Sequence, residues 1–336
     1  MNPKNNMDGG FANHGRKIIF RKKWAKPILD AFKNKLGKKL IYLGLPGTEA
    51  LDVKEWIDSI YKVIAFICDE GESEPKAIDV LNGILNEFET KEILSNYSLY
   101  NGYIEEVVLT GIDQDLAPFS QSDFVTLYNL DFCNPLQSPF KRQDEYGNVK
   151  KYHKIETIDK LLSIEKERAQ ASNGDTGFIM FLTVNAKFWE DSMGAISDSI
   201  ISTYIKNLGE VSGESREIRL LKAYTYYFLN LYFQKYGFNA EFLPPIYYEG
   251  VGGYYTDRKF NPHWLMTFTI FGTFVSEGAS TQGTENYLKS KFLFANNVDI
   301  KPYTDRNKRI KENECQHIVD KLIEESETYK KMLVTR

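Results

Sequence analysis

Five apolar runs, separated by helical patterns or polar loops, limit the folds that this chain can adopt. The runs span residues 40–45, 62–71, 105–113, 123–136 and 176–188, and helical patterns fill 48–61, 74–94, 155–170 and 190–236. Strands that are apolar on both faces are typical of a parallel sheet covered by helices on either side. The alternation therefore predicts an α/β protein with a doubly wound sheet.

Two further strand-like segments close the pattern, over 240–250 and 264–274. Because no helical pattern separates them, we expect an antiparallel pair at one edge of the sheet. With the five earlier runs, they give a mainly parallel, seven-stranded sheet with an antiparallel C-terminal hairpin.

The flanking segments differ in composition from this central part. Residues 1–16 are polar and rich in Gly and Asn, which is typical of a disordered leader. Residues 17–37 are basic and amphipathic, and residues 284–336 are charged and helical in pattern, without strand signals. We therefore expect a leader (1–16), a basic N-terminal helix (17–37), a doubly wound domain (38–283) and a charged helical extension (284–336).

The net charge is −4 over 336 residues, so the whole chain has no bias toward nucleic acid, and only a local basic patch would supply one. The longest nearly apolar run, 263–275, is too short to cross a bilayer. Three cysteines, Cys68, Cys133 and Cys315, are far apart, and the four histidines have no metal-ligand spacing. We expect a cytoplasmic protein with no metal site and no membrane contact.

Polar residues and glycines gather where the predicted strands end. In a doubly wound sheet, ligands bind at the carboxyl ends of the strands, so these residues are the candidates for a site. They are Gly44, Pro46, Gly47 and Glu49 after the first strand, Asp69 and Glu70 after the second, Asp113 after the third, and Asp131, Asn134 and Pro135 after the fourth.

Each of these residue types has a chemical use at a strand end. Glycines let the backbone approach a ligand, and the helix behind them offers free N–H groups. Asp69 or Glu70 is placed to accept hydrogen bonds from ribose hydroxyls, and Asp113 from an exocyclic amine of adenine. The segment from Asp131 to Pro135 is placed to hold the reacting end of a substrate.

Over residues 38–275 the chain resembles the class I S-adenosylmethionine-dependent methyltransferases. The likeness lies in "LIYLGLPG", "VIAFICDEG", "VVLTGID", "DFVTLYNLDFCNPL" and the closing "WLMTFTIFGTF". It implies a Rossmann-like domain that binds S-adenosylmethionine, with Gly44 and Gly47 under the methionine part of the cofactor. It also implies that Asp131, Asn134 and Pro135 form the motif that orients the methyl acceptor.

Two departures from the family pattern define the alternatives. Tyr42 stands where the family usually has an acid, and the acceptor motif ends in Leu136 in place of a proline and an aromatic residue. The alternative function is a catalytically inactive methyltransferase-like subunit or sensor in a protein assembly. If the chain bound a dinucleotide, the same loop would correspond to the motif G-x-G-x-x-G. Tyr42 would then replace the first glycine of that motif.

The acceptor is left open between a nucleic acid and a small molecule. Three segments are candidates for binding a nucleic acid or a protein partner. They are the basic N-terminal segment, the Tyr-rich loop 247–259 and the C-terminal helices.

Overall fold

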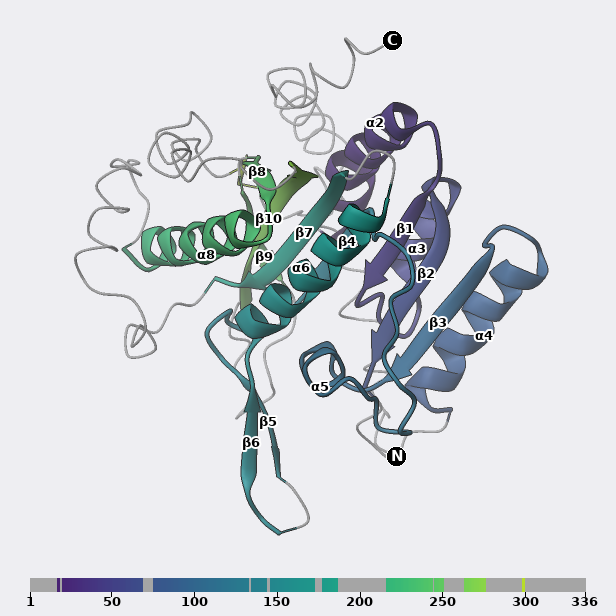
Figure 1. Ribbon diagram of the computed structural model, residues 1–336, viewed down its shortest axis with the longest axis horizontal. Helices are drawn as coiled ribbons and strands as arrows, with labels where there is room; N and C mark the ends of the chain where they lie inside the picture. The colour runs from purple at the N-terminus through teal and green to yellow at the C-terminus, as the bar shows by residue number, and fades with distance from the viewer. Residues whose placement is uncertain are drawn as a thin grey trace, which may run out of the picture.

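The computed structural model describes residues 17–18, 20–68, 75–132, 134–143, 146–172, 177–186, 216–243, 245–250, 263–275 and 298–299 (Figure 1). The helices are η1 (Phe20–Ala25), α2 (Lys26–Leu36), α3 (Leu51–Trp56), η2 (Ile57–Ser59), α4 (Ala77–Thr90), α5 (Ile104–Thr110), α6 (Lys154–Ala171) and α8 (Arg216–Lys235). The strands of the main sheet are β1 (Leu40–Gly44), β2 (Ile60–Ile67), β3 (Asn96–Asn101), β4 (Leu127–Asp131), β7 (Gly177–Asn185), β8 (Phe238–Phe242), β9 (Ile246–Gly250), β10 (His263–Phe274) and β11 (Val298–Asp299). A separate hairpin consists of β5 (Phe140–Gln143) and β6 (Val149–Tyr152).

The main sheet confirms the predicted fold class. Its order is β11-β9-β10-β7-β4-β1-β2-β3, and β3, β2, β1, β4 and β7 are parallel to one another. β10 is antiparallel to β7, and β8 and β9 pair with the two halves of its other edge. Because β8 and β9 share one position, the sheet has the seven predicted positions, with β11 added beside β9.

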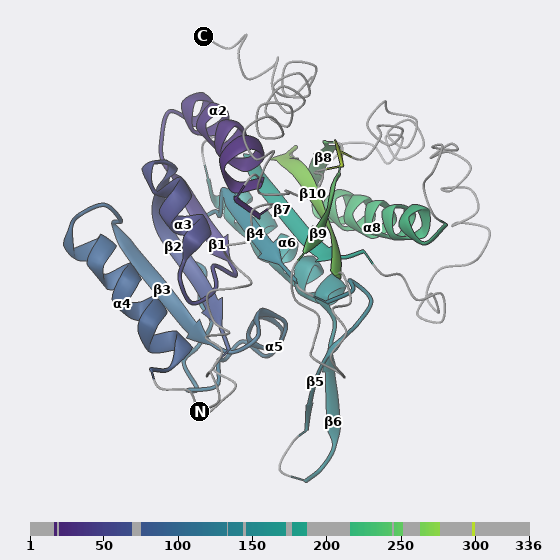
Figure 2. The ribbon, with the colours of Figure 1, turned by 180° about the vertical axis from the view of Figure 1, so that it is seen from behind.

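Helices cover both faces of the sheet (Figures 1 and 2). α2, α3 and α4 pack with η1 on one face, and α5, α6 and α8 pack on the other. Successive residues of one strand point to opposite faces of the sheet. In β7, Phe178 and Met180 pack in the core beneath α5, α6 and α8, whereas Ile179 and Phe181 pack in the core beneath η1, α2, α3 and α4. This explains why the strands read as continuous apolar runs in the sequence.

The basic N-terminal segment is helical from Phe20 to Leu36, and its aromatic residues belong to the core. Phe20 and Trp24 are buried, and the Trp24 indole N–H donates to Thr269 Oγ1 of β10 at 2.9 Å. Trp56 of α3 donates from its indole N–H to the Arg21 carbonyl at 3.0 Å. These bonds fix η1 across the sheet, which brings its basic side chains toward the strand ends.

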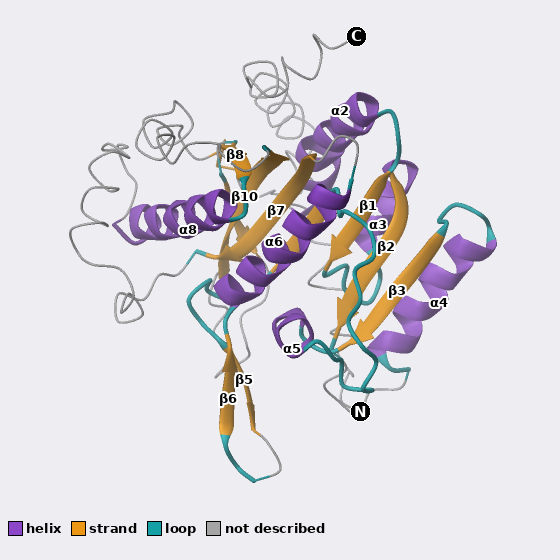
Figure 3. Cartoon of the chain, viewed as in Figure 1, coloured by secondary structure: helices purple, strands orange, loops and turns teal. Residues whose placement is uncertain are grey.

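Two local predictions are wrong. The run 105–113 lies largely in helix α5, and the third parallel strand is β3, before it. The C-terminal extension includes a short strand, β11, where none was expected. The hairpin β5–β6 lies in a segment for which the sequence predicted no helix or strand (Figure 3). The whole leader and the other residues of the extension lie outside the described residues.

Over the described ranges, none of the helices combines the length and the apolar character that a bilayer span requires.

Candidate functional site

A cavity of about 380 Å³ opens at the carboxyl ends of the parallel strands β1, β2, β3 and β4. β1 lies between β2 and β4, so the chain leaves it toward one side and later returns to its other side. This is the topological switch point, where doubly wound sheets bind ligands. Its lining residues come from η1 and the residues just before it, from the ends of all four strands and from α3, α5 and α6. They are Lys17, Arg21, Leu45, Pro46, Gly47, Leu51, Asp52, Phe66, Ile67, Cys68, Gly102, Tyr103, Ile104, Glu105, Asp131, Phe132, Asn134 and Lys154.

The loop after β1 needs two glycines for different reasons. A Cβ on Gly44 would lie 2.3 Å from the Asn129 carbonyl oxygen, because the ends of β1 and β4 approach closely there. Leu45 then donates its N–H to the same oxygen at 3.1 Å. Gly47 has φ +67°, a left-handed conformation that glycine adopts without strain, and a Cβ at this position would meet nothing within 4 Å. The loop therefore presents bare backbone to the cavity at Gly47.

Below this loop, Tyr42 and Asn129 connect the two central strands to α3. Tyr42 is fully buried, and its hydroxyl accepts a hydrogen bond from the Asn129 amide at 3.3 Å. The same amide donates to Asp52 at 2.8 Å. Burial, reinforced by the charge of Asp52, raises the pKa of Tyr42 well above its ordinary value, so this phenol stays neutral. Through Asn129, the buried Tyr42 is thus linked to Asp52, which brings a carboxylate to the cavity from the next helix.

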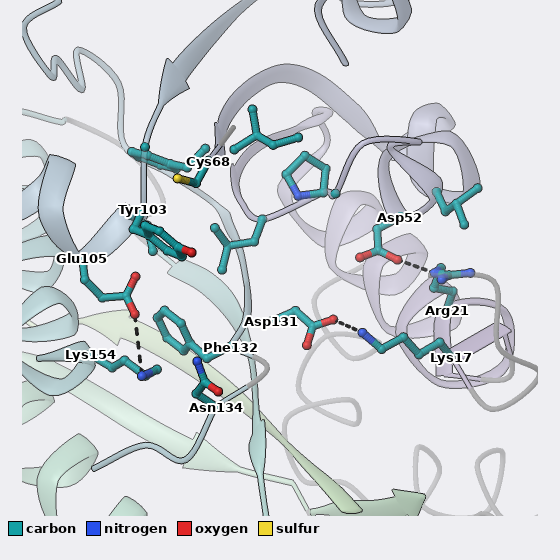
Figure 4. A pocket seen from close by; sticks show the side chains of 18 residues that line it. Lys17, Arg21, Asp52, Cys68, Tyr103, Glu105, Asp131, Phe132, Asn134 and Lys154 are labelled. Atoms are coloured by element: carbon teal, nitrogen blue, oxygen red, sulfur yellow. Dashed lines mark hydrogen bonds and ion pairs between the residues drawn. The ribbon is translucent and has the colours of Figure 1, made fainter. Parts of the chain in front are cut away.

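Two ion pairs join the N-terminal segment to the acids of the cavity (Figure 4). Arg21 pairs with Asp52, and Lys17 pairs with Asp131 at the end of β4. Burial raises the pKa of Asp52 above its ordinary value, and the Arg21 guanidinium opposes this effect. The second oxygen of Asp131, Oδ1, is buried and has no hydrogen-bond partner within the described part of the chain. Asp131 therefore keeps an acceptor atom beyond its ion pair.

The opposite wall of the cavity is built by the start of α5 and the start of α6. Glu105 and Lys154 are both buried, and Lys154 Nζ lies 3.7 Å from Glu105 Oε1. Burial raises the pKa of Glu105, and the Lys154 ammonium lowers it in part. Lys154 also lies 5.6 Å from the ring centre of Phe132, just after β4. Tyr103 completes this wall and turns an aromatic ring toward Phe132 and Asn134 (Figure 4).

The structure places four of the predicted site residues in the cavity lining: Pro46, Gly47, Asp131 and Asn134. Gly44 lies below the loop, Glu49 lies in the turn before α3, and Pro135 is buried behind Asn134. Asp113 does not line the cavity, since its carboxylate accepts the N–H groups of residues 101, 115 and 117 and so closes the loop after α5. Asp69 and Glu70 lie outside the described residues.

Several lining residues were not predicted from the sequence. Gly102 and Tyr103, directly after β3, take the position that the sequence pattern assigned to Asp113. Glu105 follows Tyr103 by two residues, whereas Lys17, Arg21 and Lys154 lie far from the strand-end loops in sequence, and only the folded chain brings these three to the cavity. Asp52 carried one signal, an acid in the first turn of the helix that follows the glycine loop. Among the residues that the structure describes, no cluster of three or more His, Cys, Asp or Glu is arranged to hold a metal ion.

Neither a family model nor a curated protein matches this chain. Solved structures with a similar fold include a proposed RNA methyltransferase from Pyrococcus horikoshii, with 15% identity, a TM-score of 0.36 and coverage of 79% of this chain and 93% of that one. An rRNA methylase from Streptococcus thermophilus has 11% identity and a TM-score of 0.33, over 74% of this chain and 94% of that one. P. horikoshii TYW2 in complex with MeSAdo has 13% identity and a TM-score of 0.31, over 70% of this chain and 57% of that one. These scores mark a distant likeness.

Proposed function

We propose that this chain is a methyltransferase that binds S-adenosylmethionine in the cavity at the ends of β1–β4. The observation that carries the proposal is the position of this cavity: it lies at the topological switch point, between a glycine loop and the acid that ends β4. Doubly wound sheets bind nucleotide-like ligands at this point. The predicted acceptor motif, Asp131 and Asn134, lines the same cavity.

The residues of the cavity fit this cofactor in charge and shape. The glycine loop offers open space at Gly47, where any side chain would enter the volume that the ligand needs. Apolar side chains of Leu45, Leu51 and Phe66 supply surface for an adenine ring or an aliphatic chain. Asp52 and Asp131 supply carboxylates, and their partners Arg21 and Lys17 supply cations, so the cavity offers groups for both the ammonium and the carboxylate of the methionine part.

S-adenosylmethionine supplies an activated methyl group when bound, so the protein's task is alignment and the exclusion of water. The paired charges Lys17–Asp131 and Arg21–Asp52 hold the acids on the N-terminal side of the cavity in fixed positions. Asp131 Oδ1, the buried acceptor atom, is available for an N–H or O–H of the acceptor and for the proton that it gives up. Asn134 follows three residues later and contributes an amide for orientation.

We expect S-adenosylmethionine to bind wild-type protein with micromolar affinity in calorimetry, and a Gly47→Arg variant to lose that binding. Gly37→Arg is the matched control. Gly37 has φ +64° and Gly47 has φ +67°, and a Cβ at either position meets nothing within 4 Å. The two substitutions therefore bring similar backbone strain, but only Gly47 lines the cavity.

Equal weakening by both substitutions would assign the effect to folding and would contradict the proposed site. Wild-type protein that gives neither heat nor a thermal shift with S-adenosylmethionine or S-adenosylhomocysteine would contradict the proposed function. That result would leave the inactive subunit or sensor as the better description.

A further inference from the structure

The hairpin β5–β6 projects away from the body of the molecule (Figures 1 and 3). It is the next element after β4, from which residues 132–139 separate it, and α6 begins just beyond it. It is a sheet of only two strands, and the residues between its first and last positions are exposed wherever they are described. Such a hairpin is marginally stable by itself. Its sequence is therefore expected to avoid unfavourable pairs, unless they serve another purpose.

Both central pairs of this hairpin place like charges opposite each other. Lys141 faces Lys151, and Arg142 faces Lys150. Directly opposed like charges destabilise an antiparallel pair. Arg142 has a counterion in Glu106 of α5, whereas no ion pair of the described residues includes Lys141, Lys150 or Lys151. The segment 140–152 holds four cationic and two acidic side chains in a chain of net charge −4. Positive charge is thus concentrated where it costs stability.

A row of aromatic rings connects the hairpin to the cavity. Tyr103, in the cavity wall, stacks on Phe140 with ring centres 4.0 Å apart. Phe140 in turn lies parallel to Tyr152, at 6.2 Å. All three rings are half-buried, so part of each is open to solvent. At the other end of the hairpin, Tyr146 is 82% exposed.

We infer that the hairpin β5–β6 binds a single-stranded polynucleotide and directs one of its nucleotides into the cavity. Cationic side chains that track a phosphate backbone, combined with aromatic rings on which bases stack, are the usual means of binding single strands. An acidic protein would match the lysines but would leave the aromatic row without a planar partner. The statement that the polynucleotide carries the methyl acceptor rests on the proposed function. The statement that the polynucleotide binds the hairpin is independent of it.

The test is fluorescence anisotropy with labelled single-stranded RNA and DNA of the same mixed sequence. We expect the double variant Lys150→Glu/Lys151→Glu to bind at least about tenfold more weakly, and its salt dependence to fall by about 0.7 in log–log slope for each phosphate that it no longer neutralises. Its Tm is expected to stay equal or to rise, because both like-charge pairs become opposite-charge pairs. Weaker binding at unchanged or greater stability separates a binding role from a structural one.

The matched control is Lys38→Glu/Lys39→Glu, which makes the same charge change at another adjacent, exposed pair of lysines. That pair directly precedes β1, at the amino-terminal end of the strand, whereas the cavity lies at the carboxyl ends of the strands. Equal loss of affinity in both double variants, unchanged affinity in the hairpin variant, or no binding by the wild type would overturn the inference. Polyglutamate, a polyanion without bases, tests whether charge alone explains the binding. The inference would also be overturned if the hairpin variant lost affinity for polyglutamate as strongly as for the oligonucleotide, or if the wild type bound duplexes more tightly than single strands. Wild-type protein that binds the oligonucleotide but not S-adenosylmethionine contradicts only the proposed function, and the reverse result contradicts only the inference.

Discussion

A Glu165→Gln variant is expected to lose much of the dependence of stability on pH that the wild-type protein shows between weakly acidic and weakly alkaline solution. Glu165 of α6 is fully buried against β4, where its Oε1 accepts hydrogen bonds from the Tyr128 hydroxyl at 2.6 Å and the Val125 N–H at 3.1 Å. Gln121 donates to the same oxygen. Burial raises the pKa of Glu165 to about 8, since these hydrogen bonds offset only part of the desolvation.

The direction of the effect follows from where the proton is held. At pH values between 4.5, the ordinary pKa of the carboxyl group, and about 8, its pKa in the folded protein, the folded protein keeps the Glu165 proton while the unfolded chain releases it. The free energy of unfolding therefore falls as the pH rises through this window. For the wild type we expect a loss of about 3 kcal/mol between pH about 5.5 and pH about 8.5 from this group.

Urea denaturation of both proteins at the two pH values measures this difference. Glutamine keeps the shape of the side chain and its acceptor oxygen but has no proton to release, so the variant should lose less stability over the same interval. Equal losses in the two proteins would show that Glu165 is ionised in the folded state. Because Glu165 lies in the core between β4 and α6 and does not line the cavity, the experiment reports on the fold.

The sheet was predictable where burial on two faces dominated the choice of residues. β1, β2, β4, β7 and β10 read as apolar runs because both of their faces meet a core. β3 is the edge strand and pairs only with β2, and its sequence "NYSLYN" is largely polar, so it gave no such signal. The neighbouring "IEEVVLT" is rich in β-branched residues but folds as α5, because tertiary packing against α6 outweighs local propensity.

The cavity was predictable where it is built by strand ends and was missed where it is built by distant segments. Gly47, Asp131 and Asn134 follow apolar strands and were identified by that position. Lys17 and Arg21 enter the cavity because Phe20 and Trp24 anchor η1 in the core. In the sequence, those alternating basic and aromatic residues look the same whether they bind a partner or pack against the sheet.

A Gly44→Ala variant is expected to lose about 3 kcal/mol of stability, because one methyl group must enter a backbone contact that has no space for it. The new Cβ would lie 2.3 Å from the Asn129 carbonyl oxygen and 2.8 Å from the Tyr42 hydroxyl. The first of these is a main-chain atom of the neighbouring strand, so relief requires that β1 and β4 separate at their ends. That movement also weakens the hydrogen bond from Leu45 N–H to Asn129 O.

Gly83→Ala is the control with the opposite sign. Gly83 lies exposed in the middle of α4, and a Cβ there meets nothing within 4 Å. Alanine should therefore raise the free energy of unfolding by about 0.5–1 kcal/mol, through its greater helix propensity. Chemical denaturation of both variants measures the contrast, and a Gly44→Ala protein as stable as the wild type would show that the strand ends are loosely packed. Since the same contact forms the floor of the glycine loop, the destabilisation at Gly44 should be accompanied by weaker binding of S-adenosylmethionine, whereas Gly83→Ala should leave that binding unchanged.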